Sequence, residues 1–215
     1  AFLWAKDVGL DVPAPPPLTE LYVSPVNGLA AIRRLRTQLA DLQPGQFHFS
    51  HILLPHKPYA LRPDCSFAPV SQWRQGLRGR SIAERRNAYV RQILCTAREL
   101  AAVLDAVERS PAAENAIVIV HGDHGSRISD FTPSVDKLEQ SDRALVAWFS
   151  TLFAVRAPGM NSGYDRRHYP IADLLHELAV SDFRTTGSPP VRRPTVILAD
   201  QGMIGRHRVA LPEEW

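Results

Sequence analysis

The sequence has 215 residues, of which 45% are hydrophobic and 22% are charged. It is long enough for one large domain with a buried core, and its composition excludes disordered, collagen-like and coiled-coil chains. Lys and Arg number 25 against 22 Asp and Glu, which gives a net charge of +3. A nucleic-acid-binding surface needs a larger and more clustered excess of basic residues, so we expect no nucleic-acid partner, whereas anionic substrates are permitted.

The beginning of the sequence is rich in proline, with the run VPAPPP at residues 12–17. We expect residues 1–27 to form an extended lead-in, because proline disfavours helix and sheet interiors, and residues 28–215 to form the folded domain. No segment approaches the roughly 18 consecutive apolar residues of a membrane span. The chain begins with Ala, which suggests a processed product or a part of a longer protein.

Three segments show the apolar spacing of an amphipathic helix. The first covers residues 28–41, and the third follows Pro170 over residues 171–178. The second and longest starts at Ser81 and Glu84, which have the spacing of a capping box, and ends before Ser110-Pro111. We therefore predict three helices.

Four segments have the length and the apolar, often β-branched character of strands: residues 47–54, 116–120, 150–156 and 195–198. Strands and helices alternate, which favours an α/β fold with a mostly parallel sheet and helices on both faces. Ligands of such sheets bind beyond the carboxyl ends of the strands. The turns after residues 54 and 120 could therefore share one crevice.

The turn after the strand at 116–120 reads His121-Gly-Asp123-His124-Gly. Asp and neutral imidazole are ligands for zinc, manganese or iron, and the two glycines allow a turn that brings the side chains together. In a regular strand, Asp123 and His124 would point to opposite faces. The alternative is a polar turn that caps the next segment.

The segment Pro55-His56-Lys57-Pro58-Tyr59 follows the strand at 47–54. His56 could donate a hydrogen bond to a substrate oxygen, and Lys57 could attract a phosphate or sulfate group. The alternative is an ordinary strand end with an exposed charge.

Together, the two turns resemble the sulfatase-like branch of the alkaline phosphatase superfamily, which includes arylsulfatases, phosphoethanolamine transferases and lipoteichoic acid synthases. The likeness lies in the order: a strand ending at His56, a long helix, and an apolar strand ending Gly-Asp123-His124-Gly. The segment STLFAVRAPG at 150–159 is similar to the strand after the metal loop. The resemblance spans roughly residues 46–160.

The resemblance implies that Asp123 and His124 bind a divalent metal (Zn, Mn, Ca or Mg) and that His56 contacts a sulfate or phosphate ester. Lys57 and Arg127 are expected as further anion contacts, and His121 as a neighbour of the metal ligands. The expected reaction is hydrolysis or transfer of a sulfuryl or phosphoryl group through a covalent intermediate. Many relatives act outside the cytoplasm, often with an amino-terminal membrane tether, so we expect an extracytoplasmic or membrane-associated protein.

The family's nucleophile is not found in this sequence. Neither Cys65 nor Cys95 stands in the Cys-x-Pro/Ala-x-Arg signal that precedes formylglycine, and we expect both to be structural. Two cysteines are too few for a disulfide framework and too far apart for a zinc knuckle. We therefore expect a carboxyl-terminal part of a sulfatase-like protein that is inactive alone.

Two other interpretations remain. The scaffold could bind an anion or a partner without catalysis, since no nucleophile is found. The turn at 121–124 also partly imitates the His-x-His-x-Asp-His signature of metallo-β-lactamase-like hydrolases, although Ile119 occupies the place of the first imidazole.

Overall fold

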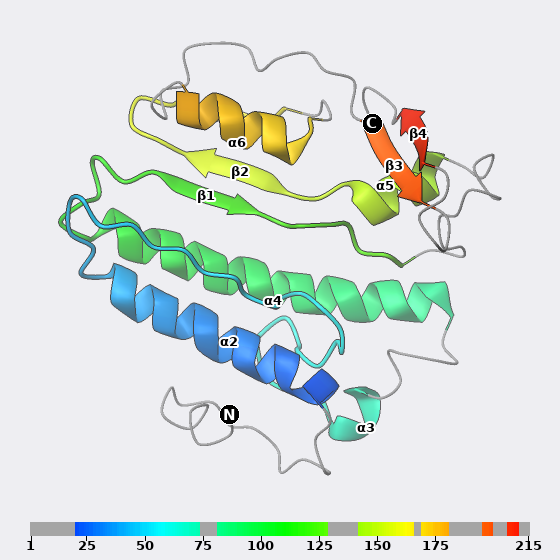
Figure 1. The fold of residues 1–215 in the computed structure, drawn as a ribbon. Coiled ribbons are helices and arrows are strands. Elements are labelled where there is room, and N and C mark those ends of the chain that lie inside the picture. The colour runs from blue at the N-terminus through cyan, green and yellow to red at the C-terminus, as the bar shows by residue number, and fades with distance from the viewer. Residues whose placement is uncertain are drawn as a thin grey trace. The chain divides into compact units, whose positions relative to one another are not determined.

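The computed structural model describes residues 20–73, 81–128, 142–165, 169–180, 195–199 and 206–210. The chain divides into two compact units, Ala1–Glu114 and Asn115–Trp215. We describe each unit by itself (Figure 1).

The first unit is built on two helices that lie side by side, α2 (Glu20–Leu39) and α4 (Ile82–Glu108) (Figure 1). The apolar side chains of α2 provide much of its core, and Leu29 and Ile32 are fully buried. Both residues belong to the apolar spacing that predicted this helix. A short helix, α3 (Val70–Trp73), lies in the connection between α2 and α4, and its residue Trp73 is buried.

Helix α2 begins eight residues before the predicted start at residue 28. The extended conformation expected for residues 1–27 is therefore wrong for residues 20–27, and residues 1–19 lie outside the described part of the chain. Pro25 lies inside the helix but only in its second turn, and it is buried together with Val26. Burial of this apolar pair favours the helix over the extended form that its proline suggests.

Helix α4 confirms the predicted long helix and its capping box, because Ser81 Oγ accepts from Glu84 N and Glu84 Oε2 accepts from Ser81 N. Its buried face differs from the predicted apolar stripe. Val90 belongs to the apolar spacing that predicted this helix, yet it is 50% exposed, whereas Gln92 and Glu99 are buried. No helix in the described ranges is long and apolar enough to cross a membrane.

The predicted buried strand at 47–54 is wrong. These residues have no strand conformation, and Phe47 and Phe49 are 88% and 80% exposed. An apolar sequence forms a strand only where a neighbouring strand accepts its backbone hydrogen bonds. The only backbone bond within this segment is local, from Leu54 N to Ile52 O.

The second unit contains an antiparallel pair, β1 (Val118–His121) and β2 (Phe153–Arg156), in which His121 is paired with Phe153. The structure also has helices α5 (Asp142–Phe149) and α6 (Ile171–Val180) and a second antiparallel pair, β3 (Thr195–Ala199) and β4 (Arg206–Ala210).

Strands β1, β2 and β3 and helix α6 confirm elements that were predicted from the sequence. The expected parallel pairing is not found among the described strands, because both pairs are antiparallel. Apolar, β-branched strands are typical of parallel sheets, but their composition does not fix their direction.

Candidate functional site

The turn after β1 is fixed by backbone hydrogen bonds to the segment that leads into β2. The N–H groups of Gly122, Gly125 and Arg127 donate to the carbonyl oxygens of Leu152 (3.0 Å), Trp148 (2.8 Å) and Ala147 (3.1 Å). These bonds continue the β1–β2 pairing beyond its last residue pair. The turn therefore has a defined path along the carboxyl end of α5.

The two glycines of this turn lie where a side chain has no room. A Cβ on Gly122 would overlap Oγ1 of Thr151, and a Cβ on Gly125 would overlap the carbonyl oxygen of Ala147 and lie 2.8 Å from that of Ser150. Backbone oxygens cannot move aside without distortion of α5. Glycine is therefore required by the close approach of the two chain segments.

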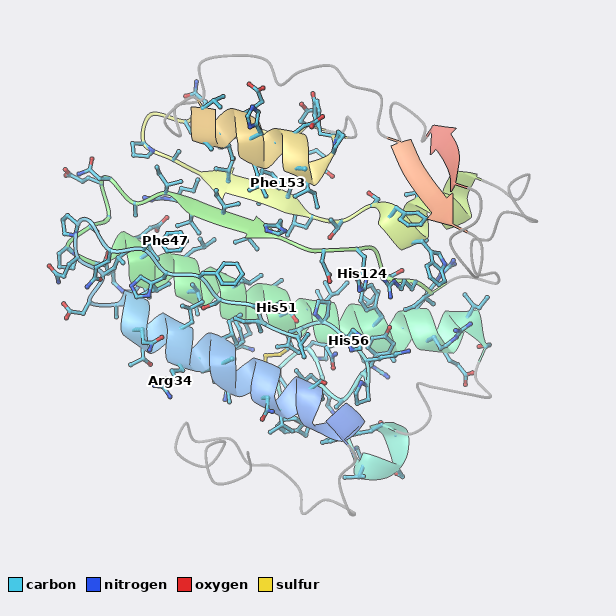
Figure 2. All side chains as sticks on the ribbon, viewed as in Figure 1. Arg34, Phe47, His51, His56, His124 and Phe153 are labelled. Carbon is cyan, nitrogen blue, oxygen red and sulfur yellow. A yellow bond between two sulfur atoms is a disulfide. The ribbon has the colours of Figure 1, made fainter. Side chains whose placement is uncertain are left out.

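This turn brings Asp123 and His124 together. Oδ1 of Asp123 lies 3.7 Å from Nε2 of His124. Nδ1 of His124 donates to the carbonyl oxygen of Gly125 at 2.7 Å, so in the neutral ring Nε2 carries the free lone pair. Asp123 is largely exposed, and His124, which Figure 2 labels, is partly exposed. An oxygen donor and a nitrogen donor are thus adjacent and reachable from solvent.

Arg127 and His121 flank this pair, and both contact aromatic rings. The guanidinium carbon of Arg127 lies 5.6 Å from the ring centroid of Trp148, and the backbone of Arg127 has a φ of 55°. The imidazole of His121 stacks on Phe153 with a centroid distance of 6.2 Å. Arg127 is exposed, so its N–H groups can reach a ligand while its face rests on the indole.

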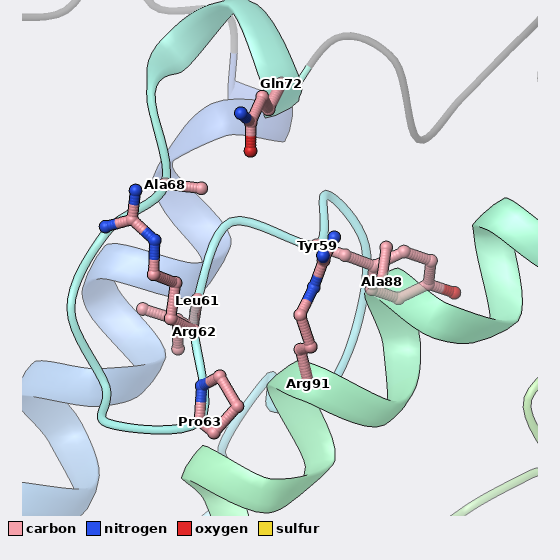
Figure 3. Close-up of a pocket in the computed structure, with 8 residues that line it drawn as sticks. All are labelled: Tyr59, Leu61, Arg62, Pro63, Ala68, Gln72, Ala88 and Arg91. Atoms are coloured by element: carbon pink, nitrogen blue, oxygen red, sulfur yellow. The ribbon is translucent and has the colours of Figure 1, made fainter.

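His56 and Lys57 lie on the first unit, in an exposed loop between Pro55 and Pro58. Nδ1 of His56 donates to the carbonyl oxygen of Lys57 at 2.7 Å, which leaves Nε2 as the free ring atom. The loop continues through Tyr59 into the wall of a small pocket beside α4 (Figure 3).

Gln92 of α4 fixes this loop through hydrogen bonds to its backbone. This role of Gln92 was not predicted from the sequence. Its Nε2 donates to the carbonyl oxygens of Pro55 (3.2 Å) and His56 (2.8 Å), and its Oε1 accepts from the N–H groups of Ala60 (2.8 Å) and Leu61 (3.1 Å). Gln92 is fully buried. A lone glutamine among apolar residues of a helix carries no signal that would predict these four bonds.

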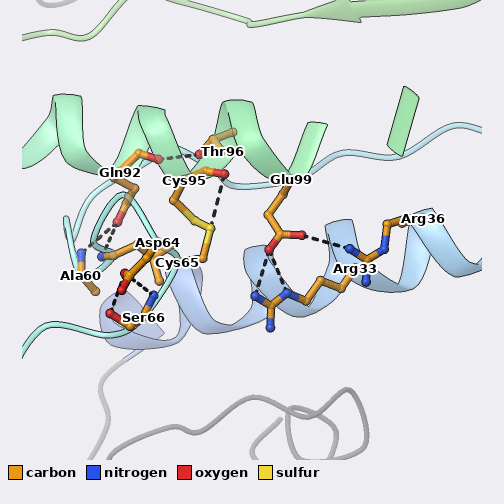
Figure 4. The surroundings of a disulfide bond; sticks show 11 residues. Arg33, Arg36, Ala60, Asp64, Cys65, Ser66, Gln92, Cys95, Thr96 and Glu99 are labelled. Carbon is orange, nitrogen blue, oxygen red and sulfur yellow. Dashed lines mark hydrogen bonds and ion pairs between the residues drawn. A yellow bond between two sulfur atoms is a disulfide. The ribbon is translucent and has the colours of Figure 1, made fainter. Parts of the chain in front are cut away.

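A disulfide between Cys65 and Cys95 joins the same loop region to α4 (Figure 4). Their Cα atoms are 5.0 Å apart, and both residues are buried. The expectation that both cysteines are structural agrees with this pairing. The sequence did not predict the bond itself, because a separation of 30 residues does not show which segments meet.

The predicted site residues therefore fall into two groups. Asp123, His124 and Arg127 follow one strand of the second unit, and His56 and Lys57 belong to the first unit. The expectation that both groups contact one ester stays a prediction. His48, His51 and His176, for which no role was predicted, are exposed, and His168 lies outside the described residues.

The sequence matches the Sulfatase family over residues 29–179. The chain belongs to the sulfatase family. The matched region is more than half of the chain and contains all five predicted site residues. It confirms the resemblance to the sulfatase-like branch of the alkaline phosphatase superfamily and supports an α/β fold of that type. Comparisons with curated proteins and with solved structures find no match.

Sulfatases generally use a divalent metal, and the donor set of the turn after β1 fits part of such a site. A carboxylate oxygen and an imidazole Nε2 are suitable ligands for a divalent cation, and the hydrogen bond from Nδ1 of His124 orients its ring. A stable site needs roughly three or more protein ligands. The described ranges contain no group of three His, Cys, Asp or Glu side chains placed to hold a metal.

Proposed function

We propose that this sulfatase-family chain serves the metal-dependent hydrolysis or transfer of a sulfuryl or phosphoryl group, with Asp123 and His124 as two of the metal ligands. The observation that carries this proposal is the approach of Oδ1 of Asp123 to Nε2 of His124, with Nδ1 committed to the backbone. A polar turn that only capped the next segment would not require its carboxylate and imidazole to converge at solvent.

The metal, when bound, would stabilise negative charge on the nucleophile or on the leaving oxygen. The protein's own part is to hold its two ligands in one orientation. The bonds that join the turn to residues 147–152 fix the backbone, and the bond from Nδ1 of His124 to Gly125 O fixes the ring. Zinc, manganese, calcium and magnesium all remain candidates.

We propose that His56, Lys57 and Arg127 bind the charged oxygens of the ester. His56 presents a free Nε2, and Lys57 and Arg127 are exposed cations. Charge-assisted hydrogen bonds from such groups are the usual means of holding sulfate and phosphate. Gln92 would support this role because it fixes the carbonyl of His56 from below.

The chain by itself should be nearly inactive, because two ligands hold a metal weakly and no nucleophile is identified in the sequence. The proposed activity therefore belongs to a longer protein that supplies a nucleophile and further ligands. A non-catalytic anion-binding module is the second candidate function. The lack of a three-ligand group among the described residues favours it.

We also propose that the protein folds in an oxidising compartment outside the cytoplasm. The support is the buried disulfide between Cys65 and Cys95, since such bonds persist mainly in secreted, periplasmic or lumenal proteins. A membrane tether in a longer protein stays a prediction from the family.

The test of the metal ligands is Mn²⁺ binding, measured from the electron paramagnetic resonance signal of the free ion. We expect weak binding near one equivalent, which the variants Asp123→Ala and His124→Ala abolish. Asp105→Ala, at an exposed aspartate of α4, is the matched control and should bind as the unmodified chain does. Equal binding by the Asp123→Ala variant would contradict the proposed ligand role.

The test of catalysis uses the protein encoded by the complete reading frame and an aryl sulfate or aryl phosphate. We expect metal-dependent cleavage that Asp123→Ala abolishes and Asp105→Ala preserves. Metal binding without any ester cleavage would favour the non-catalytic module.

A further inference from the structure

The first unit has a pocket of about 120 Å³ between α4, the loop at residues 59–69 and α3. Leu61, Ala68 and Ala88 contribute apolar surface to it. Arg62 and Arg91 lie on opposite sides of the pocket, and Gln72 lies over it (Figure 3). None of the residues proposed above to bind the metal or the ester lines this pocket.

The described polar residues that line the pocket are rich in hydrogen-bond donors and include no carboxylate. Arg62 uses one nitrogen, Nη1, to donate to the carbonyl oxygen of Phe67 at 2.8 Å and to the hydroxyl of Ser66 at 3.3 Å. Its other N–H groups have no hydrogen bond to the described residues. Arg91 makes neither a hydrogen bond nor an ion pair with any described residue. Both arginines therefore line one small cavity, and both have donors that no described residue uses.

The carboxylate closest to these groups in the sequence is already engaged. Oδ1 of Asp64 accepts from the N–H (3.0 Å) and the hydroxyl (2.7 Å) of Ser66. These hydrogen bonds, with a smaller effect of Arg62, lower the pKa of Asp64. Asp64 offsets part of the charge of Arg62, whereas Arg91 has no ion pair with a described carboxylate.

The pocket wall is held in place before any ligand arrives. The disulfide joins the loop to α4, and Ala68 N donates to Ala60 O at 2.8 Å. The indole N–H of Trp73 donates to Ala68 O at 2.7 Å. Oε1 of Gln92 accepts from Leu61 N on the other side of the loop. A rigid wall lowers the ordering cost of binding, so a small ligand can be held by few contacts.

We propose that this pocket binds a tetrahedral phosphate-type oxyanion, either free or as the head group of a phosphomonoester. The cavity of about 120 Å³ is larger than the roughly 30 Å³ that one water molecule takes up in the liquid, so it has room for a tetrahedral oxyanion. The fork of a guanidinium matches two oxygens of such an anion, and Arg62 and Arg91 approach from two sides. Leu61, Ala68 and Ala88 contribute apolar surface to the rest of the lining.

Binding is measured by isothermal titration with inorganic phosphate and, separately, with glycerol 3-phosphate. The protein carries His56→Ala, Lys57→Ala and Arg127→Ala in a metal-chelating buffer, so that neither a bound metal nor the proposed ester-binding side chains can contribute. We expect saturable binding of at least one of the two anions with one site per chain. Tighter binding of the ester would identify a phosphomonoester head group, and equal or tighter binding of inorganic phosphate would identify the free anion.

The variant Arg91→Gln should weaken this binding about tenfold, because it removes a charge-assisted hydrogen bond. Arg91 is exposed, so the variant should fold normally. Arg98→Gln, at another exposed arginine of α4, is the matched control and should leave the affinity unchanged. The absence of saturable binding, or equal losses in the two variants, would overturn the proposal. Because the proposed ester-binding residues are already replaced, neither result depends on the proposed enzymatic function.

Discussion

Nε2 of His124 lies 3.7 Å from Oδ1 of Asp123, although consecutive side chains of a regular strand point to opposite faces. The N–H groups of Gly122 and Gly125 bond the turn that makes this approach possible to Leu152, just before β2, and to Trp148 of α5. Neither glycine has space for a Cβ. The geometry of the proposed metal ligands thus depends on two residues that contribute no chemistry of their own.

We predict that Gly125→Ala lowers the free energy of unfolding by about 1–3 kcal/mol, the usual cost of an added methyl group in a tightly packed place. The new Cβ would be forced against the carbonyl oxygens of Ala147 and Ser150. The same variant should reduce Mn²⁺ binding, because the turn must shift. Chemical denaturation and metal titration measure the two effects.

The matched control for this prediction is Gly163→Ala. Gly163 is exposed and has no atom within 4 Å of the added Cβ, so stability should change by less than about 0.5 kcal/mol. Equal stability of Gly125→Ala and Gly163→Ala would show that the turn is less constrained than the structure indicates.

We predict that Gln92→Leu lowers the free energy of unfolding by at least about 3 kcal/mol, because it leaves several buried backbone groups without partners. The groups affected are two carbonyl oxygens, including that of His56, and two N–H groups, including that of Leu61. Denaturation measured by circular dichroism provides the value. Gln38→Leu, at an exposed position of α2, should be nearly neutral.

The variant Gln92→Glu separates the two halves of this interaction. A carboxylate can still accept from Ala60 and Leu61 but cannot donate to the carbonyl oxygens of Pro55 and His56. We expect hydrogen exchange to increase mainly around His56. Uniform loosening of the whole loop would argue that Gln92 fills space rather than positioning this residue.

The helices that depend on interactions between residues close in the sequence could be predicted from the sequence. The start of α4 follows from the reciprocal bonds of Ser81 and Glu84, and the apolar spacing of α2 and α6 matches the observed helices. The prediction of a strand at 47–54 was wrong because a strand requires a neighbouring strand, which the composition of the segment does not reveal. The prediction of the buried face of α4 was wrong because the polar residues Gln92 and Glu99 lie in it. Each forms hydrogen bonds with partners that are distant in the sequence.

Glu99 shows why a buried polar residue cannot be predicted from the apolar spacing of a helix. It is buried, yet its Oε1 accepts from Nε (3.0 Å) and Nη2 (2.9 Å) of Arg33 on α2, which is 66 residues away (Figure 4). Spacing along α4 cannot anticipate that partner. The candidate metal ligands were accessible to prediction for the opposite reason, since Asp123 and His124 are adjacent in the sequence and flanked by glycines.

We predict that removal of the disulfide by Cys65→Ala and Cys95→Ala lowers the free energy of unfolding by about 3–4 kcal/mol, the value expected when a loop of this length is no longer closed in the unfolded chain. The two cysteines are 30 residues apart. Addition of a reductant should destabilise the unmodified chain by a similar amount and leave the double variant unchanged. A chain whose stability does not respond to reductant would contradict the bond.

We predict that the stability of the first unit falls between pH 10 and pH 12 through Tyr59. Burial, with a smaller effect of Tyr89, raises the pKa of Tyr59 from 10.0 to about 12, although Arg85 acts in the opposite direction. The folded state therefore holds the phenolic proton more tightly than the unfolded state. The contribution to stability is complete below pH 10 and is lost as the pH rises through the folded pKa.

Tyr59 retains some contact with solvent, so we expect a loss of roughly 1–2 kcal/mol rather than the full value of a two-unit shift. The variant Tyr59→Phe should lose less stability over this range than the unmodified chain does, and Tyr89→Phe is the comparison because burial also raises the pKa of Tyr89. Ultraviolet absorbance of the phenolate gives the titration, and denaturation at each pH gives the free energy. If Tyr59 ionises near pH 10 in the folded chain, its ring is not held against α4 beside Tyr89 as the structure places it.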